Sequence, residues 1–235
     1  MKYNEFVEST SLQDDDVLLI QEATTLGIKK VKLSTLKQYI GIKEVTPNQY
    51  YLHDTFTDTN GKSLSTHLMD IGDGWSTSDT NWKISNNKAV TGYAVGSGTL
   101  VHANSGFSNV EVKADITFVN QGVNSQQGLI LRAIDSNNYL LLRYIFLANS
   151  FRITQTINGN QSDLVSASAS VSNGSESILK FVASGDNLLG FLNDVQIINT
   201  ATSILSTATR CGLWAFEQGS GLGASWDNFI AQKVV

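Results

Sequence analysis

Apolar and polar residues alternate in short runs along most of the chain from residue 51 onward. A period of two is that of a β-strand, whose successive side chains lie on opposite faces of a sheet. Glycine, asparagine and aspartate end these runs, and turns recur about every 8 to 12 residues, the spacing expected of an antiparallel sandwich. The pattern therefore predicts an all-β domain over residues 47–235 without a long helix.

The clearest hairpin runs over residues 128–145, GLILRAIDSNNYLLLRYI, with its turn at IDSNN. Alternation places leucines on one face of both strands. The opposite face receives Arg132 from the first strand, and Tyr139 and Arg143 from the second. Arginine is rare in a buried core, so we expect these three side chains to lie outside the core.

The first 46 residues read differently and predict a small separate module. Residues 16–23 and 27–33 read as two strands of a hairpin, and residues 34–41 read as a short helix that ends at Gly41. A module of this size buries little apolar surface, and it has neither cysteines nor metal ligands to hold it together. We therefore expect it to pack against other chains; the alternative is a decorated N-terminal extension without that role.

The charge distribution agrees with this division. Residues 1–45 hold 13 charged side chains, the other 190 residues hold 24, and Pro47 lies where a linker is expected. The net charge of −5 and the lack of a basic patch argue against a nucleic-acid partner. No run reaches the roughly 18 apolar residues of a membrane helix, and the first residues lack the apolar core of a secretion signal. We therefore expect no membrane insertion, and folding in a cytoplasm.

The sequence lacks an evident catalytic group, and we expect no enzyme activity. Glycosidases need two carboxyl groups about 5 to 9.5 Å apart. Glu111 and Asp115 share a strand face but lie roughly 13 Å apart along the strand, although a pair from different strands stays open. The single cysteine, Cys211, lies in an apolar strand, which favours a buried, unreactive thiol over a nucleophile.

Aromatic and arginine side chains are the candidate ligand-binding groups, because sugars stack on aromatic rings and offer hydroxyls to planar donors. The expected members of a glycan site are Trp75, Tyr93, Arg132, Tyr139 and Arg143. The other three tryptophans lie in strand-like contexts typical of a core: Trp82, Trp214 and Trp226. The two arginines have the alternatives of pairing with acidic side chains or packing against another subunit.

Several segments, in order, resemble concanavalin A-like (laminin G-like) jelly-roll domains: DTFTDTNGKSLSTH, NWKISNNKAV, GLILRAIDSNNYLLLR, LLGFLNDVQI, GLWAF and SWDNFIAQKV. The resemblance covers residues 52–233 and implies a β-sandwich of the kind common in carbohydrate-binding modules and phage receptor-binding proteins. It also implies that the first and last strands pair, which brings Asp54 near Asp227, and that a structural Ca²⁺ lies near this seam. The alternative is that these aspartates only cap turns.

The stretch DVLLIQ, followed after a short gap by KKVKLSTLKQYI, resembles N-terminal modules of phage tail, baseplate and head-fibre proteins. This resemblance implies attachment to a virion, often as a trimer. The sequence therefore favours a phage virion protein of the head- or tail-fibre type, exposed on the particle as a homotrimer. We expect residues 1–46 to bind other virion proteins and the larger domain to bind host surface glycan. The alternative is a structural decoration or adaptor protein without a glycan ligand.

Overall fold

The computed structural model describes these stretches of the chain, the first two by their backbone alone: 17–21, 28–32, 50–77, 79–91, 98–122, 124–217 and 223–234. The chain divides into two compact units, residues 1–47 and 48–235. In the first unit β1 (Val17–Gln21) pairs antiparallel with β2 (Ile28–Lys32), so the predicted hairpin is confirmed. The helix expected over residues 34–41 lies outside the described residues.

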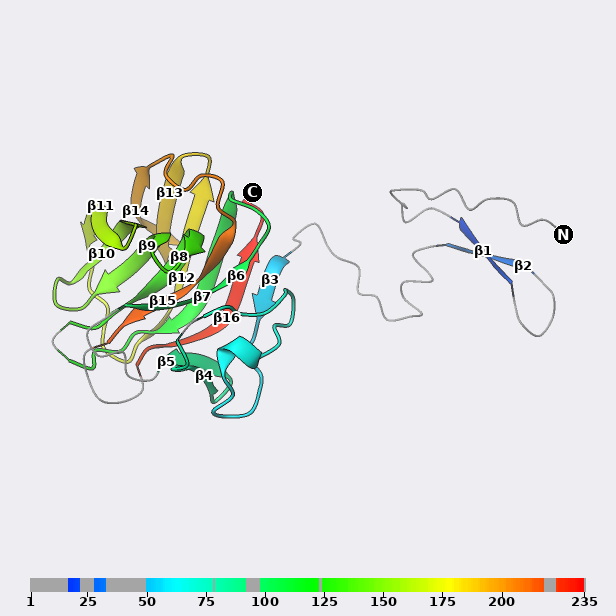
Figure 1. The fold of residues 1–235 in the computed structure, drawn as a ribbon, viewed down its shortest axis with the longest axis horizontal. Helices are drawn as coiled ribbons and strands as arrows, with labels where there is room; N and C mark the ends of the chain where they lie inside the picture. The colour runs from blue at the N-terminus through cyan, green and yellow to red at the C-terminus, as the bar shows by residue number, and fades with distance from the viewer. Residues whose placement is uncertain are drawn as a thin grey trace. The chain divides into compact units, whose positions relative to one another are not determined.

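The second unit is a sandwich of two antiparallel sheets (Figure 1). The smaller sheet has six strands in the order β11-β10-β9-β8-β15-β6. Its strands are β6 (Thr99–Asn104), β8 (Gln126–Asp135), β9 (Asn138–Ile145), β10 (Ser150–Ile157), β11 (Asn160–Ser168) and β15 (Arg210–Phe216).

The larger sheet has the order β14-β13-β12-β7-β16-β5-β4, and β3 also pairs with β16. Its strands are β3 (Tyr50–Asp54), β4 (Trp82–Ser85), β5 (Lys88–Thr91), β7 (Val110–Thr117), β12 (Glu176–Ser184), β13 (Asn187–Leu192), β14 (Val195–Ala201) and β16 (Ser225–Gln232).

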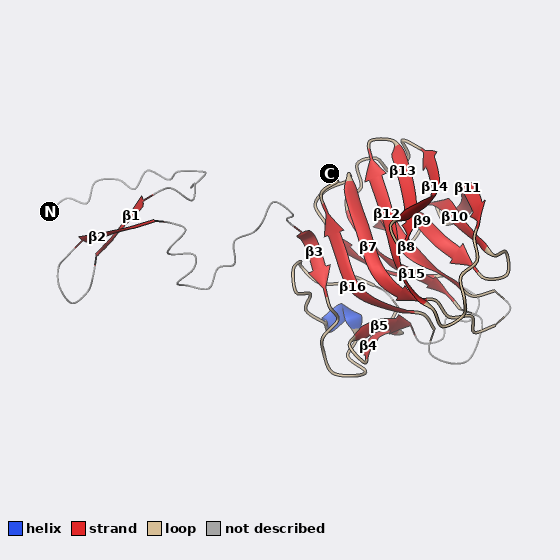
Figure 2. Cartoon of the chain, turned by 180° about the vertical axis from the view of Figure 1, so that it is seen from behind, coloured by secondary structure: helices blue, strands red, loops and turns tan. Residues whose placement is uncertain are grey.

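Strands dominate the described part of the chain, which also contains one 3-10 turn, η1 (Leu64–Thr66), the helical element of Figure 2. The predicted all-β class is confirmed. No helix among the described residues is long and apolar enough to cross a membrane.

The main core lies between the two sheets and follows from the period of two. In β7, for example, Val110, Val112, Ala114 and Ile116 are buried while the residues between them are not. Each fully buried aliphatic or aromatic side chain contributes roughly 1.5 to 3 kcal/mol relative to an exposed one. Two tryptophans predicted for the core are confirmed there, since the rings of Trp82 and Trp226 lie 5.2 Å apart and are fully buried.

A β-bulge in β8 changes the side of the sheet on which Arg132 lies. Ile130 pairs with Gly212 and Ala133 with Arg210, so β8 carries one extra residue relative to β15. Arg132 takes a left-handed backbone conformation, with φ 49°. The bulge turns the Arg132 side chain toward the eight-stranded sheet. The prediction that it shares a face with Tyr139 and Arg143 is therefore wrong.

The side chain of Arg132 bridges the two sheets. Its guanidinium donates hydrogen bonds to the backbone oxygens of Ser108 and Gly185 and to Asn109 Oδ1, all at the ends of strands in the opposite sheet. Only 1% of the residue is exposed. Burial lowers the pKa of the guanidinium, although an arginine stays charged at any ordinary pH. Arg132 is thus a structural residue.

A buried histidine holds the segment that follows β3. His67 is 4% exposed, and its Nε2 lies 3.0 Å from Asp54 Oδ1 while its Nδ1 lies 3.0 Å from Asp58 Oδ2. A carboxylate at each ring nitrogen favours the imidazolium form, which donates from both nitrogens. Burial lowers the pKa of His67, but its hydrogen bonds to Asp58 and Asp54 outweigh burial and leave the pKa raised. The hydrogen bond to His67 lowers the pKa of Asp58 to about 2.

We predict that Arg132→Ala destabilises the protein by about 2 to 4 kcal/mol, because it removes charged hydrogen bonds and leaves buried carbonyl oxygens without a donor. Urea unfolding of the full chain measures this. The matched control is Arg152→Ala, at a side chain that is 32% exposed and pairs with Asp163, where the expected loss is below about 1 kcal/mol. Equal losses in the two variants would contradict the bridging role of Arg132.

We predict that stability falls as the pH rises above 6.5. The reason is the pKa of His67, which is raised in the folded state. Its contribution to stability is complete below the unfolded-state pKa of 6.5 and is lost as the pH rises through the folded-state pKa. Thermal melts between about pH 6 and pH 9 measure this. His67→Gln should melt lower near pH 6 and lose most of the pH dependence, whereas His53→Gln should keep it. A wild-type melting temperature that stays constant over this range would contradict stabilisation by the charged His67 between Asp54 and Asp58.

Candidate functional site

The face of the six-stranded sheet turned away from the eight-stranded sheet, called the outer face below, carries a second apolar cluster. Its buried members are Leu100, Ile130, Ala133, Tyr139, Leu141 and Trp214, with Phe216 packed against them. Tyr139 and Trp214 are joined by a hydrogen bond of 3.2 Å from the indole Nε1 to the tyrosine oxygen. These residues are buried within the chain itself, so side chains and loops of the same chain cover this part of the outer face.

Gly128 lies between the two largest side chains of the outer face. It pairs with Arg143 on one side and with Trp214 on the other. Because Gly128 has no side chain, the Arg143 guanidinium reaches over the Trp214 ring, with 5.7 Å from Cζ to the ring centroid. A Cβ at Gly128 would lie 2.0 Å from the backbone oxygen of Leu142, so only glycine fits at this place.

Arg143 is held by side chains from two further strands. Its Nη1 donates to Gln126 Oε1 at 2.8 Å and to Gln161 Oε1 at 2.6 Å, and its Nη2 donates to Asp163 Oδ1 at 3.2 Å. Since each glutamine presents its oxygen to Arg143, its N–H groups are left without a partner among the described residues. Arg143 is 8% exposed, so its position is set by the protein before any ligand binds.

Asp163 balances part of this positive charge. It accepts hydrogen bonds from Arg143, from Arg152 and from Thr154 Oγ1, the last at 2.9 Å. Burial raises the pKa of Asp163, but these partners, Arg152 first, outweigh burial and leave the pKa lowered. Burial lowers the pKa of Arg143, against the opposing effect of the Asp163 charge. The pair therefore stays ionised, with two guanidinium groups around one carboxylate.

Above Arg143 the outer face is hollowed into a pocket of about 310 Å³, which we call the Arg143 pocket. It draws on β8, β9, β10, β11 and β15 and on the turns beside them. Thr156 Oγ1, which is buried in its wall, has no hydrogen-bond partner among the described residues. The lining residues are Gly98, Gln126, Ser136, Asn137, Tyr139, Arg143, Thr156, Gly159, Gln161, Trp214 and Phe216.

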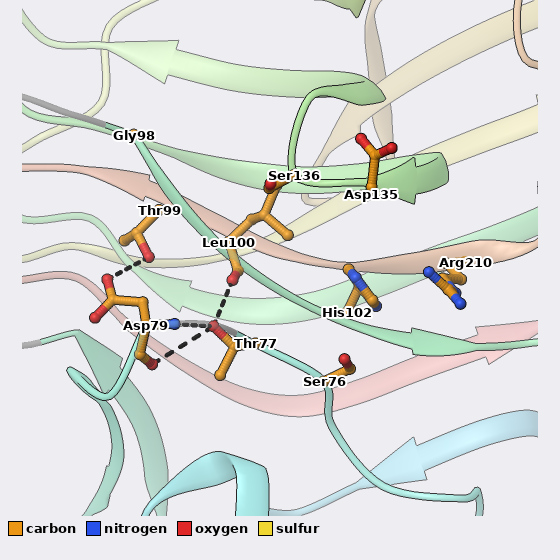
Figure 3. A pocket seen from close by; sticks show the side chains of 10 residues that line it. All are labelled: Ser76, Thr77, Asp79, Gly98, Thr99, Leu100, His102, Asp135, Ser136 and Arg210. Carbon is orange, nitrogen blue, oxygen red and sulfur yellow. Dashed lines mark hydrogen bonds between the residues drawn. The ribbon is translucent and has the colours of Figure 1, made fainter. Parts of the chain in front are cut away.

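A second pocket of about 410 Å³ adjoins the first, and the two share Gly98 and Ser136 (Figure 3). We call it the His102 pocket. Ser76 extends the edge of β6 here, through backbone hydrogen bonds with His102 of 2.8 and 3.0 Å. The lining residues are Ser76, Thr77, Asp79, Gly98, Thr99, Leu100, His102, Asp135, Ser136 and Arg210.

The structure brings two of the predicted site residues together, Tyr139 and Arg143, and separates two others from them. Arg132 faces the opposite sheet. Trp75, expected in the glycan site, is 5% exposed and packs between Phe56 and Phe229. Its indole Nε1 donates to Asp54 Oδ2 at 2.6 Å, so the ring lies in the core although its backbone lies in a loop, and Trp75 is not part of the Arg143 pocket. Tyr93 lies outside the described residues.

Trp214 is the main residue of this site that the sequence analysis assigned elsewhere. It was predicted for the core, and it is buried, but on the outer face beside Arg143. The signal lay in RCGLWAF, where Arg210, Gly212 and Trp214 alternate with the small apolar residues that face the core. His102 and the two glutamines that hold Arg143 carried no sequence signal of their own. Cys211 is confirmed as buried, and burial raises its thiol pKa to about 12.

The two aspartates expected near a Ca²⁺ lie on opposite faces of the sheet. The pairing of the first and last strands, β3 and β16, is confirmed, but Asp54 lies opposite Phe229 in the core while Asp227 lies opposite Asp115 on the other face of the sheet. Asp54 Oδ1 accepts hydrogen bonds from Phe56 N and His67, and its Oδ2 accepts one from Trp75, so both oxygens have partners. Among the described residues no group of three or more potential metal ligands is found. The alternative reading, that Asp54 caps a turn, fits its bond to Phe56 N.

A comparison with protein-family models and with curated proteins finds no match for the chain. Solved structures of similar fold include the carbohydrate-binding module CBM66 from Bacillus subtilis, which is 18% identical, with 68% of this chain and 91% of that chain covered and a TM-score of 0.51. The β-glucanase of Bacillus licheniformis is 8% identical, with coverages of 78% and 97% and a TM-score of 0.53.

A third structure of similar fold is a xylan β-1,4-xylosidase from Bacillus halodurans C-125, which is 15% identical over 77% of this chain, with a TM-score of 0.58. The chain spans only 39% of that enzyme's length. Similarity at these identities is evidence of fold alone. The larger unit is thus a jelly-roll β-sandwich of the concanavalin A-like kind, as the sequence predicts.

Proposed function

We propose that the protein binds glycan without cleaving it, and that the Arg143 pocket is the place of binding. The observation that carries this proposal is the fixed position of Arg143, which two glutamines and Asp163 hold beside Trp214 at the base of an open pocket. A preformed site loses little conformational entropy when a ligand binds.

The chemistry of the pocket suits the hydroxyl groups of a sugar. The amide N–H groups of Gln126 and Gln161 are donors, and Thr156 Oγ1 can both donate and accept. Tyr139 and Trp214 add apolar surface at the wall, against which the C–H groups of a sugar ring pack. The similar fold of a carbohydrate-binding module supports this proposal.

The carboxyl groups that line the two pockets, and the hydrogen bonds that they accept, support binding without hydrolysis. Among the described residues, the only carboxyl groups that line the two pockets are Asp79 and Asp135. A glycosidase needs a carboxylic acid whose pKa is raised, so that it can protonate the leaving group. Hydrogen bonds from Asn137 N and Asn138 instead lower the pKa of Asp135. Asp79 already accepts hydrogen bonds from Asn81 N and Thr99.

The wider proposal is that this domain is carried on a phage virion. Residues 1–46 would anchor a homotrimer to other virion proteins, and the glycan would belong to the host surface. The support is the sequence resemblance of the first 46 residues, together with the β1–β2 hairpin, since an isolated two-stranded hairpin is at best marginally stable in water. Several linked copies would raise the avidity of weak single sites.

We predict that the full chain binds at least one polysaccharide on an array of bacterial envelope glycans, and that Arg143→Gln weakens this binding by at least about tenfold. The matched control is Arg152→Gln, because Arg152 shares Asp163 with Arg143 but does not line the pocket. Melting temperatures of both variants establish that they are folded. Absence of binding to every glycan would favour the adaptor alternative, and release of reducing ends would contradict binding without cleavage.

We predict that light scattering gives the mass of a homotrimer for the full chain and of a monomer for a chain that starts at Gln49. The reason is that the larger unit has a core between its two sheets, whereas the sequence of the first 46 residues offers little apolar surface for one. A monomer in both cases would contradict the anchor, and a trimer in both would place the contact in the larger unit.

A further inference from the structure

His102, in the second pocket, has no side-chain hydrogen-bond partner among the other described residues. The residue is 7% exposed and lines the pocket with Arg210 and Ser76 around it (Figure 3). Its Nδ1 is buried without a hydrogen-bond partner, and no hydrogen bond from its Nε2 to the described residues is found. Buried polar groups are nearly always hydrogen-bonded, so a molecule outside the protein chain is the natural partner.

The His102 ring presents one donor and one acceptor. Burial lowers its pKa, and the nearby positive charge of Arg210 lowers it further, so the ring is neutral near pH 7. A neutral imidazole donates from one nitrogen and accepts at the other. A sugar hydroxyl also donates and accepts, and is therefore a matched partner for either nitrogen.

The other groups of the pocket favour an uncharged ligand over an anion. Asp79 and Asp135 bring two negative charges, against one positive charge on Arg210. Both carboxylates accept hydrogen bonds from their own loops, Asp79 from Asn81 N at 2.8 Å and Asp135 from Asn137 N at 2.7 Å. They therefore act on a ligand chiefly through their charge, which repels an anion.

The two pockets are neighbours because Gly98 and Ser136 line both, and together they are called the groove. The Gly98 backbone lies against Trp214, since a Cβ there would come within 2.6 Å of the indole ring. No side chain of residue 98 therefore separates the pockets. A ligand unit in the Arg143 pocket can continue into the His102 pocket across Ser136, whose hydroxyl has no partner among the described residues.

We propose that the His102 pocket is a second sugar subsite, so that the protein binds a stretch of at least two sugar units, with an uncharged unit over His102. This inference rests on the proposed glycan binding at Arg143. It goes beyond it because a single terminal sugar would fill only the first pocket.

The test measures affinity against chain length by calorimetry on the full chain. The probe is the polysaccharide with the strongest array signal. Partial acid hydrolysis cuts it into a series of fragments of one, two, three or more sugar units. The affinity of the wild type should rise by at least about tenfold when a second or third unit is added. In His102→Phe and in Ser76→Tyr, which fill the second pocket, the single sugar should bind as in the wild type and the rise should be lost.

The controls separate this inference from the function on which it rests. Ser65→Tyr, at an exposed position in η1 away from the groove, should keep the rise with chain length. Inorganic phosphate in large excess should leave that rise unchanged. An equal rise in all variants, no rise in the wild type, or competition by phosphate would overturn the second subsite while leaving glycan binding intact. Failure of every fragment and of the polysaccharide to bind would instead remove the proposed function itself.

Discussion

The constraint on which the site depends is that β8 and β9 must serve two apolar layers at once. Their leucines on one side fill the core between the sheets, and their residues on the other side form the outer cluster with Trp214. Gly128 allows the second layer to form, because its missing side chain lets Arg143 reach Trp214. The contact with Trp214 thus adds to the hydrogen bonds from Arg143 to Gln126, Gln161 and Asp163.

Much of the fold follows from the sequence because the period of two is a local signal. In β9 the alternation places Tyr139, Leu141 and Arg143 together, as found. The bulge at Arg132 is different in kind. It depends on the pairing of β8 with β15, about 80 residues away in the chain, and a left-handed arginine has no local signature. The one extra residue in β8 places the Arg132 side chain on the face of the hairpin opposite to the predicted one.

The other differences between the predicted and the observed positions of site residues also arise from contacts between residues far apart in the sequence. The alternation in β15 identifies the face of Trp214, but only the position of β15 beside β8 brings that face next to Gly128 and Arg143. Asp54 and Asp227 lie in neighbouring strands, as expected, but a register shift in β16 next to Asp227 places their side chains on opposite faces. Trp75 follows a glycine-rich stretch that indicates a loop, yet a single buried acceptor, Asp54, holds it in the core.

The electrostatics of the groove fix its main donor in place. Arg143 is stabilised by an ionised partner and by amide oxygens, an arrangement that sets the position of its guanidinium. The buried acid with a raised pKa, Glu217, lines neither pocket, and burial is the main cause of its shift. Its Oε1 accepts hydrogen bonds from Gln127 and Ala224 N, which commits it to the interior. The fixed donors around Arg143 are the part of the groove's chemistry on which the proposed recognition of a sugar rests.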